Sequence, residues 1–300
     1  MISGYNLENE ILNIAGLKNF YPLLSGYDHG WAMRKYNAIN STKNNLSKYH
    51  FVWNKRVYDG IKEDLKDKSP IITGCPYRNF KDRNNISALK KKNSLYFYVH
   101  STNKISIEQK INVFLDSLNK LSKNLKPIDI CLHWHDYKNK NLVRYLKNEG
   151  YKIFCAGNIY STQYMENLYK IIRNYNHCLS NQLGTYSLLS IDLKIPFTIL
   201  DPEPEYFNFG RDLNVPGEYR VSDFKFGNIA RKKFLNKFNI DQDLIDFVNF
   251  ELGVNDKEES KLIKKIILSE LKDSMDELKF KKISKYFTKK IYETFSLILK

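Results

Sequence analysis

The loop most suited to binding an anion is the hexapeptide at residues 180–185, between an apolar run and a helix-like segment. Ser180, Asn181 and Thr185 can donate side-chain hydrogen bonds, and Gly184 lets a ligand approach the backbone closely. A helix that begins directly behind the loop adds free N–H groups and a dipole that favours an anion. The loop therefore predicts a phosphate site, and the alternative is that Ser180 or Thr185 simply caps the helix.

A second polar stretch lies near the N-terminus, where Asp28 and His29 stand between two glycines and next to Trp31. A carboxylate or an imidazole can act as a general base when a reacting hydroxyl comes within hydrogen-bond reach. Either Asp28 or His29 is therefore a candidate base. The alternative is a turn that is anchored by the tryptophan.

Further polar residues directly follow apolar runs of the chain. They are Ser101 after residues 95–99, His133, His135 and Asp136 after residues 128–132, and Gly157 and Asn158 after residues 151–156. Glu203 lies in a Pro-rich acidic loop at residues 201–206, where it could bind a sugar or ribose hydroxyl or simply face solvent.

Alternation of short apolar runs with helical periods predicts the elements that position these residues. Between residues 94 and 215 the pattern predicts an α/β domain with a parallel sheet, including a helix over residues 105–121. Ligands of such sheets bind beyond the carboxyl ends of the strands, where the polar residues fall. The pattern also predicts a short N-terminal α/β unit over residues 1–80, which a basic linker at residues 79–93 joins to this domain. Residues 216–300 are predicted to form a helical, basic C-terminal segment.

Composition limits the classes of partner. The formal net charge of the 300 residues is +15, which suits polyanions, but the lysines are scattered and the aromatic residues fall mainly in core-like segments. We therefore expect no nucleic-acid binding, which would need basic residues interleaved with exposed aromatic ones. Lysines surround an apolar helix face near the C-terminus, so this segment either lies on an anionic membrane or packs on the protein, and packing is slightly favoured.

Cysteine spacing and hydropathy indicate the compartment. The four cysteines show no zinc-site spacing, and three of them fall in predicted buried strands. The N-terminal residues show no positively charged region and no apolar core, and no window approaches ~18 consecutive apolar residues, so we expect neither a signal peptide nor a transmembrane helix. We expect reduced thiols and a cytoplasmic protein, with a possible peripheral position at the inner face of the membrane.

The run from His177 to Thr185, followed by Leu189, Ile191 and Lys194-Ile195-Pro196-Phe197, resembles the donor-binding half of bacterial glycosyltransferases with the two-domain GT-B fold. More narrowly, it resembles enzymes that build capsule and lipooligosaccharide, including the sialyltransferase-like and Kdo-transferase-like groups. In this resemblance His133 and His135 stand where a His-Pro motif would be, although no proline follows either. Ser180 and Asn181 stand where a Ser-Ser or Ser-Thr pair would be.

The resemblance implies two Rossmann-like domains, the first one short, and transfer of a sugar from a nucleotide-sugar donor to a glycan or lipid-linked glycan acceptor. His133 or His135 would bind phosphate or protonate the leaving group, and Gly157 and Glu203 would line the nucleoside pocket. No Asp-x-Asp motif suited to a divalent cation on a diphosphate is found, so we expect neither a metal nor a cofactor. The alternatives are a sugar-nucleotide epimerase or glycerophosphotransferase on the same scaffold, and a non-enzymatic polyanion-binding protein.

Overall fold

The structure is a computed structural model and describes residues 4–36, 47–100, 105–108, 111–208 and 217–276. Its centre is a five-stranded parallel sheet with the order β7-β6-β4-β8-β9. The strands are β4 (Lys92–Phe97), β6 (Ile128–Cys131), β7 (Ile153–Phe154), β8 (Tyr175–Ser180) and β9 (Phe197–Ile199). Strand β4, the first strand of this sheet in the sequence, is thus central. The strands that follow it are added on one side as β6 and β7 and on the other side as β8 and β9, so the strand order reverses between β4 and β8. Open α/β sheets bind ligands at such a reversal.

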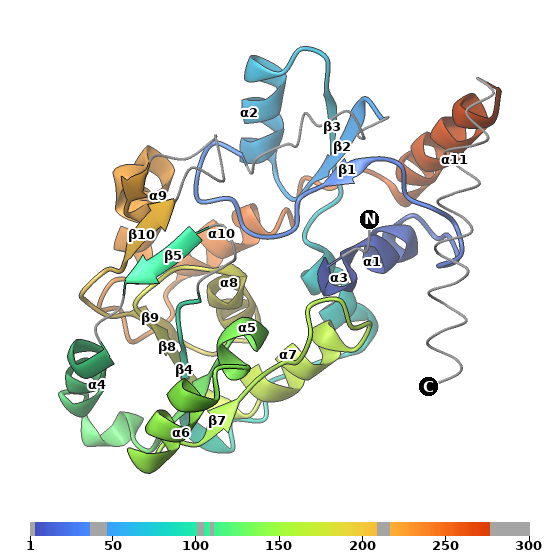
Figure 1. Cartoon of the computed structure of the whole chain (residues 1–300). Coiled ribbons are helices and arrows are strands. Elements are labelled where there is room, and N and C mark those ends of the chain that lie inside the picture. The colour runs from blue at the N-terminus through green and yellow to red at the C-terminus, as the bar shows by residue number, and fades with distance from the viewer. Residues whose placement is uncertain (1–3, 37–46, 101–104, 109–110, 209–216, 277–300) are drawn as a thin grey trace.

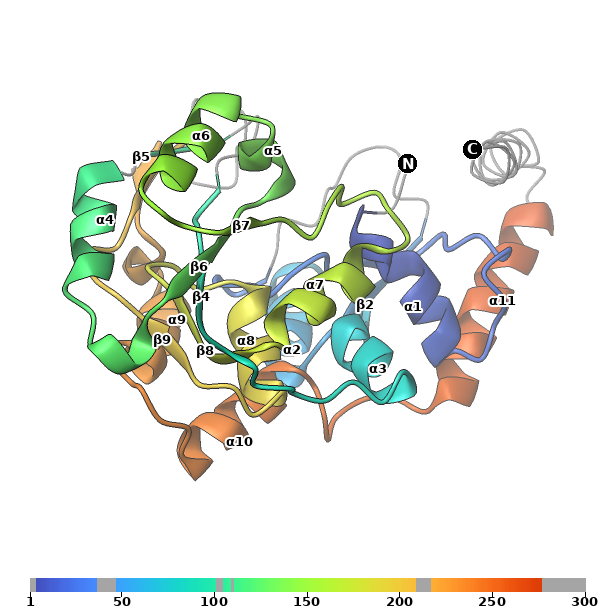
Figure 2. The same cartoon turned by 90° about the horizontal axis from the view of Figure 1, so that it is seen from below.

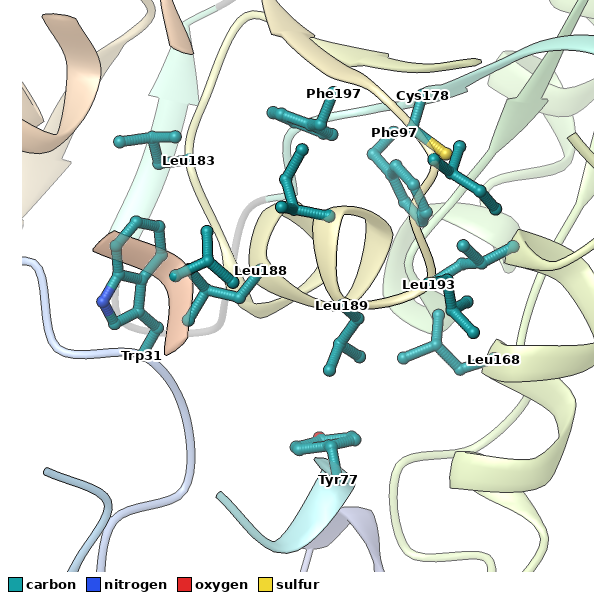
Figure 3. Close-up of a cluster of buried hydrophobic side chains, with 14 of the residues drawn as sticks. Trp31, Tyr77, Phe97, Leu168, Cys178, Leu183, Leu188, Leu189, Leu193 and Phe197 are labelled. Atoms are coloured by element: carbon teal, nitrogen blue, oxygen red, sulfur yellow. The ribbon is translucent and has the colours of Figure 1, made fainter. Parts of the chain in front are cut away.

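Both faces of this sheet are covered, which explains its near-continuous apolar strands. Tyr96 of β4 packs with α4 (Ile111–Asn119) and α6 (Lys140–Asn148). Leu95 and Phe97, its neighbours in the strand, point the other way, because successive side chains alternate between the faces. They pack with α7 (Tyr164–Ile172) and α8 (Thr185–Asp192), whose leucines fill the core drawn in Figure 3.

A second, three-stranded parallel sheet is built from the N-terminal part of the chain. Its strands β1 (Gly26–Tyr27), β2 (Tyr49–Val52) and β3 (Ser69–Ile72) follow one another in space. Helix α1 (Leu7–Ile14) and the C-terminal helix α11 (Ser260–Asp276) share a core with Phe51, whereas α2 (Lys55–Asp64) packs with Val52. Helix α11, the last described element, therefore lies beside the N-terminal sheet (Figure 1).

A small antiparallel sheet corrects two expectations from the sequence. Residues 105–108 were expected to begin a long helix, but they form β5 (Ile105–Glu108), which pairs with β10 (Glu205–Asn208). The alternation Ile-Ser-Ile-Glu has the period of a strand, and a partner from a distant part of the chain decides its conformation. The loops expected after residue 200 likewise contain β10 and β11 (Glu218–Tyr219).

The segment read as a basic linker begins as a helix. Helix α3 (Pro76–Arg83) starts with a proline, which suits the first turn, and it packs Phe80 on Tyr169. Its basic residues are ion-paired rather than solvated, because Lys81 contacts Asp192 and Arg83 contacts Glu10.

The α/β class with parallel sheets is confirmed, whereas a division into two Rossmann-like domains stays a prediction. The remaining helices are α5 (Trp134–Tyr137), α9 (Lys225–Phe234) and α10 (Gln242–Glu251), with short 3-10 turns at Gly4–Asn6, Lys123–Leu125 and Val221–Asp223. Of the predicted C-terminal helical segment at residues 216–300, residues 225–234, 242–251 and 260–276 are helical, and residues 277–300, with the basic amphipathic helix expected there, lie outside the described residues. Within the described ranges, no helix has the length and apolar composition that crossing a bilayer requires.

Candidate functional site

Three histidines meet at the carboxyl edge of the central sheet. His100 follows β4 and His133 follows the neighbouring parallel strand β6, so both side chains emerge at the same edge. Their rings stack with centroids 4.1 Å apart, and the ring of His135 lies 5.3 Å from that of His133. The sequence predicts His133 and His135 as site residues and does not predict His100. The signal for His100 was its position directly after an apolar run.

Burial keeps His100 and His133 uncharged. Burial first, and the adjacent imidazoles second, lower the pKa of His100 to about 4 and that of His133 to about 3. Nδ1 of His133 accepts a hydrogen bond from the backbone N–H of His135 at 3.4 Å, which assigns the proton of the neutral ring to Nε2. Nε2 is buried and has no partner among the described residues. His133 therefore holds a neutral N–H group that no described residue accepts from.

An acid lies one helical turn away in α5. Burial raises the pKa of Asp136 to about 6, and its buried Oδ2 has no hydrogen-bond partner in the described part of the chain. Tyr98, in the same environment, has its pKa raised to about 12 by burial and by the charge of Asp136. Asp136 thus titrates in a range in which it can exchange a proton with a ligand.

A cavity of about 300 Å³ adjoins this cluster. Its walls come from α5 and from the loop after β7, and they are Trp134, Tyr137, Lys138, Cys155, Gly157 and Asn158. Nζ of Lys138 lies 3.8 Å from the ring centroid of Trp134, and Gly157 has a φ of +92°, which favours glycine. Gly157 and Asn158, both predicted, therefore share one cavity with an aromatic wall.

The loop at residues 180–185 is held by the protein itself. Ser180 is fully buried, and its Oγ donates to the carbonyl of Phe97 at 2.8 Å. Asn181 is also buried, with Nδ2 donating to Pro202 O at 3.4 Å and Oδ1 lacking a partner among the described residues. Neither Ser180 nor Thr185 caps α8, because the N-cap residue is Gly184, whose N–H donates to Ser187 Oγ.

The N-terminal polar stretch reaches this loop. The backbone N–H of Trp31 donates to Thr185 Oγ1 at 3.2 Å. Within the stretch, Asp28 is buried and His29 is exposed. Nε2 of His50 in β2 lies 3.5 Å from Oδ1 of Asp28, a contact between distant segments that the sequence pattern does not reveal.

Glu203 and Ser101 complete the predicted set. Glu203 Oε1 accepts from the N–H of Ser222 at 3.1 Å, and its Oε2 lies 3.5 Å from Nε of the buried Arg231. Arg231 also donates to Asp201 and to the carbonyl of Asn181. Glu203 is thus engaged on the β9 side of the sheet rather than in the cavity, and Ser101 lies outside the described residues.

No protein-family model matches the sequence, and no curated protein shows significant similarity to it. Across the described residues, no group of three or more His, Cys, Asp or Glu side chains is arranged to hold a metal ion.

Proposed function

We propose that the chain is a glycosyltransferase that moves a sugar from a nucleotide-sugar donor to a surface-glycan acceptor at the cytoplasmic side of the membrane. The observation that carries this proposal is the stacked pair His100–His133 next to the cavity, at the carboxyl edge of a parallel sheet. Sites at this edge hold nucleotides in many α/β proteins. In this proposal the two sheets form the donor and acceptor halves of a GT-B-type enzyme.

The donor would lie along the sheet edge. Nε2–H of His133 would donate to a phosphate oxygen, and Asp136 would exchange a proton with the leaving group. The nucleoside would occupy the cavity against Trp134, next to Gly157 and Asn158. Uncharged donors that are fixed before the ligand arrives stabilise developing negative charge without reorganisation. In this arrangement the buried Ser180 and Asn181 and the partly buried Glu203 support the site, and Gly184 and Thr185 place the start of α8.

The acceptor would approach from the N-terminal sheet. His29 is exposed and can meet a hydroxyl, whereas Asp28 is buried next to His50. We therefore assign His29 as the base and Asp28 as the residue that supports it. Thr185 connects the two halves through Trp31.

A nucleotide-binding assay tests the donor half of the proposal, and a sugar-transfer assay tests the acceptor half. A thermal-shift series with CMP, UDP, GDP, ADP and CDP, with and without magnesium, should show one binder, because a ligand at 100 times its Kd stabilises by ~2.7 kcal/mol. His133→Asn should abolish that shift, since it removes the Nε2–H donor. His29→Asn should keep the shift and lose transfer. A wild-type protein that no nucleotide stabilises would remove the proposal.

Product analysis separates the nearest alternatives. A sugar-nucleotide epimerase or a glycerophosphotransferase would show the same nucleotide shift. An epimerase changes the donor sugar without an acceptor, and a glycerophosphotransferase transfers glycerol phosphate in place of a sugar. A glycosyltransferase instead releases nucleotide in equal amount to glycosylated acceptor.

A further inference from the structure

One face of the molecule carries a dense set of cations beside the candidate site. This basic face runs from the end of α5 along α6 to the start of β7. Its exposed members are Lys138, Lys140, Arg144, Lys147 and Lys152. Glu149 is the one acidic residue between residues 138 and 152. The face therefore has five positive charges and one negative charge within fifteen residues.

Helix geometry aligns the central three cations. Lys140, Arg144 and Lys147 are spaced i, i+4 and i+7, so they lie on one side of α6. The opposite side packs Leu146, which is fully buried, against the central sheet. Figures 1 and 2 both place α6 at the outside of the molecule.

The cations of this face are not neutralised by the protein. In the described part of the chain, none of the five forms an ion pair. Lys138 instead lies over the ring of Trp134. Their charge is thus available to an external anionic partner.

Helix α11 provides a comparison within the same molecule. Between residues 256 and 273 five lysines (257, 261, 264, 265 and 272) are matched by five acids (256, 258, 259, 270 and 273). The two helices lie at opposite ends of the molecule in both views (Figures 1 and 2). The excess of positive charge therefore belongs to α6 rather than to α11.

We propose that the basic face docks the protein on an anionic lipid bilayer. A convex helix with its cations along one line fits a flat charged surface. Single-stranded nucleic acid would instead need a groove lined with stacking aromatic rings. The exposed Tyr137 and Tyr145 flank the cations, and tyrosine suits the boundary between water and lipid because it has an apolar ring and a polar end.

Docking through this face would bring the cavity to the bilayer. Lys138 belongs to the basic face and also lines the cavity, so the cavity adjoins the basic face. If the proposed glycosyl transfer is correct, a lipid-linked acceptor would meet the site in the plane of the membrane. The docking itself does not depend on that function, because it requires no nucleotide.

Vesicle co-sedimentation of the full chain tests the docking. The vesicles are phosphatidylcholine alone, or phosphatidylcholine with one third phosphatidylglycerol, in 0.1 M salt without nucleotide. We expect binding to the anionic vesicles only. The triple variant Lys140→Gln, Arg144→Gln, Lys147→Gln should bind about 100-fold more weakly, because each charge near an anionic surface contributes about fivefold. Its melting temperature should match that of the wild type, since all three side chains are exposed.

The matched control removes three exposed lysines from the other end of the molecule. Lys261→Gln, Lys265→Gln, Lys272→Gln should change vesicle binding less than threefold. The proposal is overturned if the wild type ignores anionic vesicles or binds neutral ones equally. It is also overturned if the α11 variant loses binding while the α6 variant keeps it, or if the α6 variant loses binding only to a single-stranded oligonucleotide.

Discussion

The backbone N–H of Trp31 and the Oγ1 of Thr185 are joined by a 3.2 Å hydrogen bond that spans 154 residues of sequence. Trp31 follows the first strand of the N-terminal sheet, and Thr185 is the first residue of α8, which covers the central sheet. The indole of Trp31 also packs on Phe226, Phe234 and Phe247. Trp31 thus connects the N-terminal sheet, the start of α8 and the helices α9 and α10.

Thr185→Val should destabilise the protein by about 1 kcal/mol, because it leaves the partly buried N–H of Trp31 without its acceptor. The volume of the side chain is nearly unchanged, so packing is preserved. Urea unfolding measures the change. Thr185→Ser keeps the acceptor and should stay close to the wild type. A valine variant as stable as the wild type, with a loss only in the serine variant, would show that the methyl group matters rather than the hydrogen bond.

Glu251→Ala should be far more damaging, at about 3–5 kcal/mol, because it breaks a buried ion pair and leaves Arg56 uncompensated. Glu251 is fully buried at the end of α10, and its carboxylate accepts from Arg56 Nη2 at 2.7 Å and from the Trp31 indole at 2.8 Å. The same denaturation assay measures it. Lys55→Ala, which breaks an exposed pair with Asp59, should cost at most about 1 kcal/mol. Similar effects of the two substitutions would contradict a structural role for the buried pair.

Local pattern predicted most of the central sheet. The apolar runs at residues 128–132 and 196–200 became β6 and β9, and the periodic segment at residues 164–176 contains α7. These elements are buried on both sides or on one regular face, so the spacing of their apolar residues is enough to predict their secondary structure. Cys131 and Cys178 are accordingly buried in strands, whereas Cys155 follows β7 and is half-buried.

Pairing between distant segments could not be predicted from the sequence pattern. β5 depends on β10, which lies about a hundred residues later, and α3 is held by contacts to α1 and α8. The candidate site was likewise predicted only in its local features. Its residues at strand ends could be named, but the stack of His133 on His100 and the approach of His50 to Asp28 depend on which strands become neighbours. Strand order is a property of the whole fold.

Glu270→Gln should make stability less dependent on pH. Burial raises the pKa of Glu270 from its ordinary 4.5 to about 7, although hydrogen bonds from Ser25 and Ser47 favour its charged form. The folded state therefore binds the proton more tightly than the unfolded state. The resulting stability is fully present below pH 4.5 and is lost as the pH rises through 7.

The amide of the variant imitates the protonated acid. Wild type and Glu270→Gln should therefore be similarly stable at pH 5, and the variant should be more stable at pH 8 by up to about 3 kcal/mol. Chemical denaturation at the two pH values measures the difference. A constant difference between them would show that Glu270 does not take up a proton on folding.

Gly253→Ala should be among the most destabilising single changes, because two separate costs coincide at this position. The residue has a φ of +63°, and an added Cβ would lie 1.8 Å from the carbonyl oxygen of Trp53, where the chain after α10 crosses the end of β2. Backbone cannot move aside as a flexible side chain can, so we expect a loss of several kcal/mol beyond the conformational cost. Gly150→Ala is the matched control, since Gly150 has a φ of +87° and no atom within 4 Å of the added Cβ. That control should cost only about 1 kcal/mol, the price of the left-handed conformation. Thermal and urea unfolding of both variants separate the two terms, and equal losses would place the whole effect in the backbone conformation rather than in the contact with Trp53.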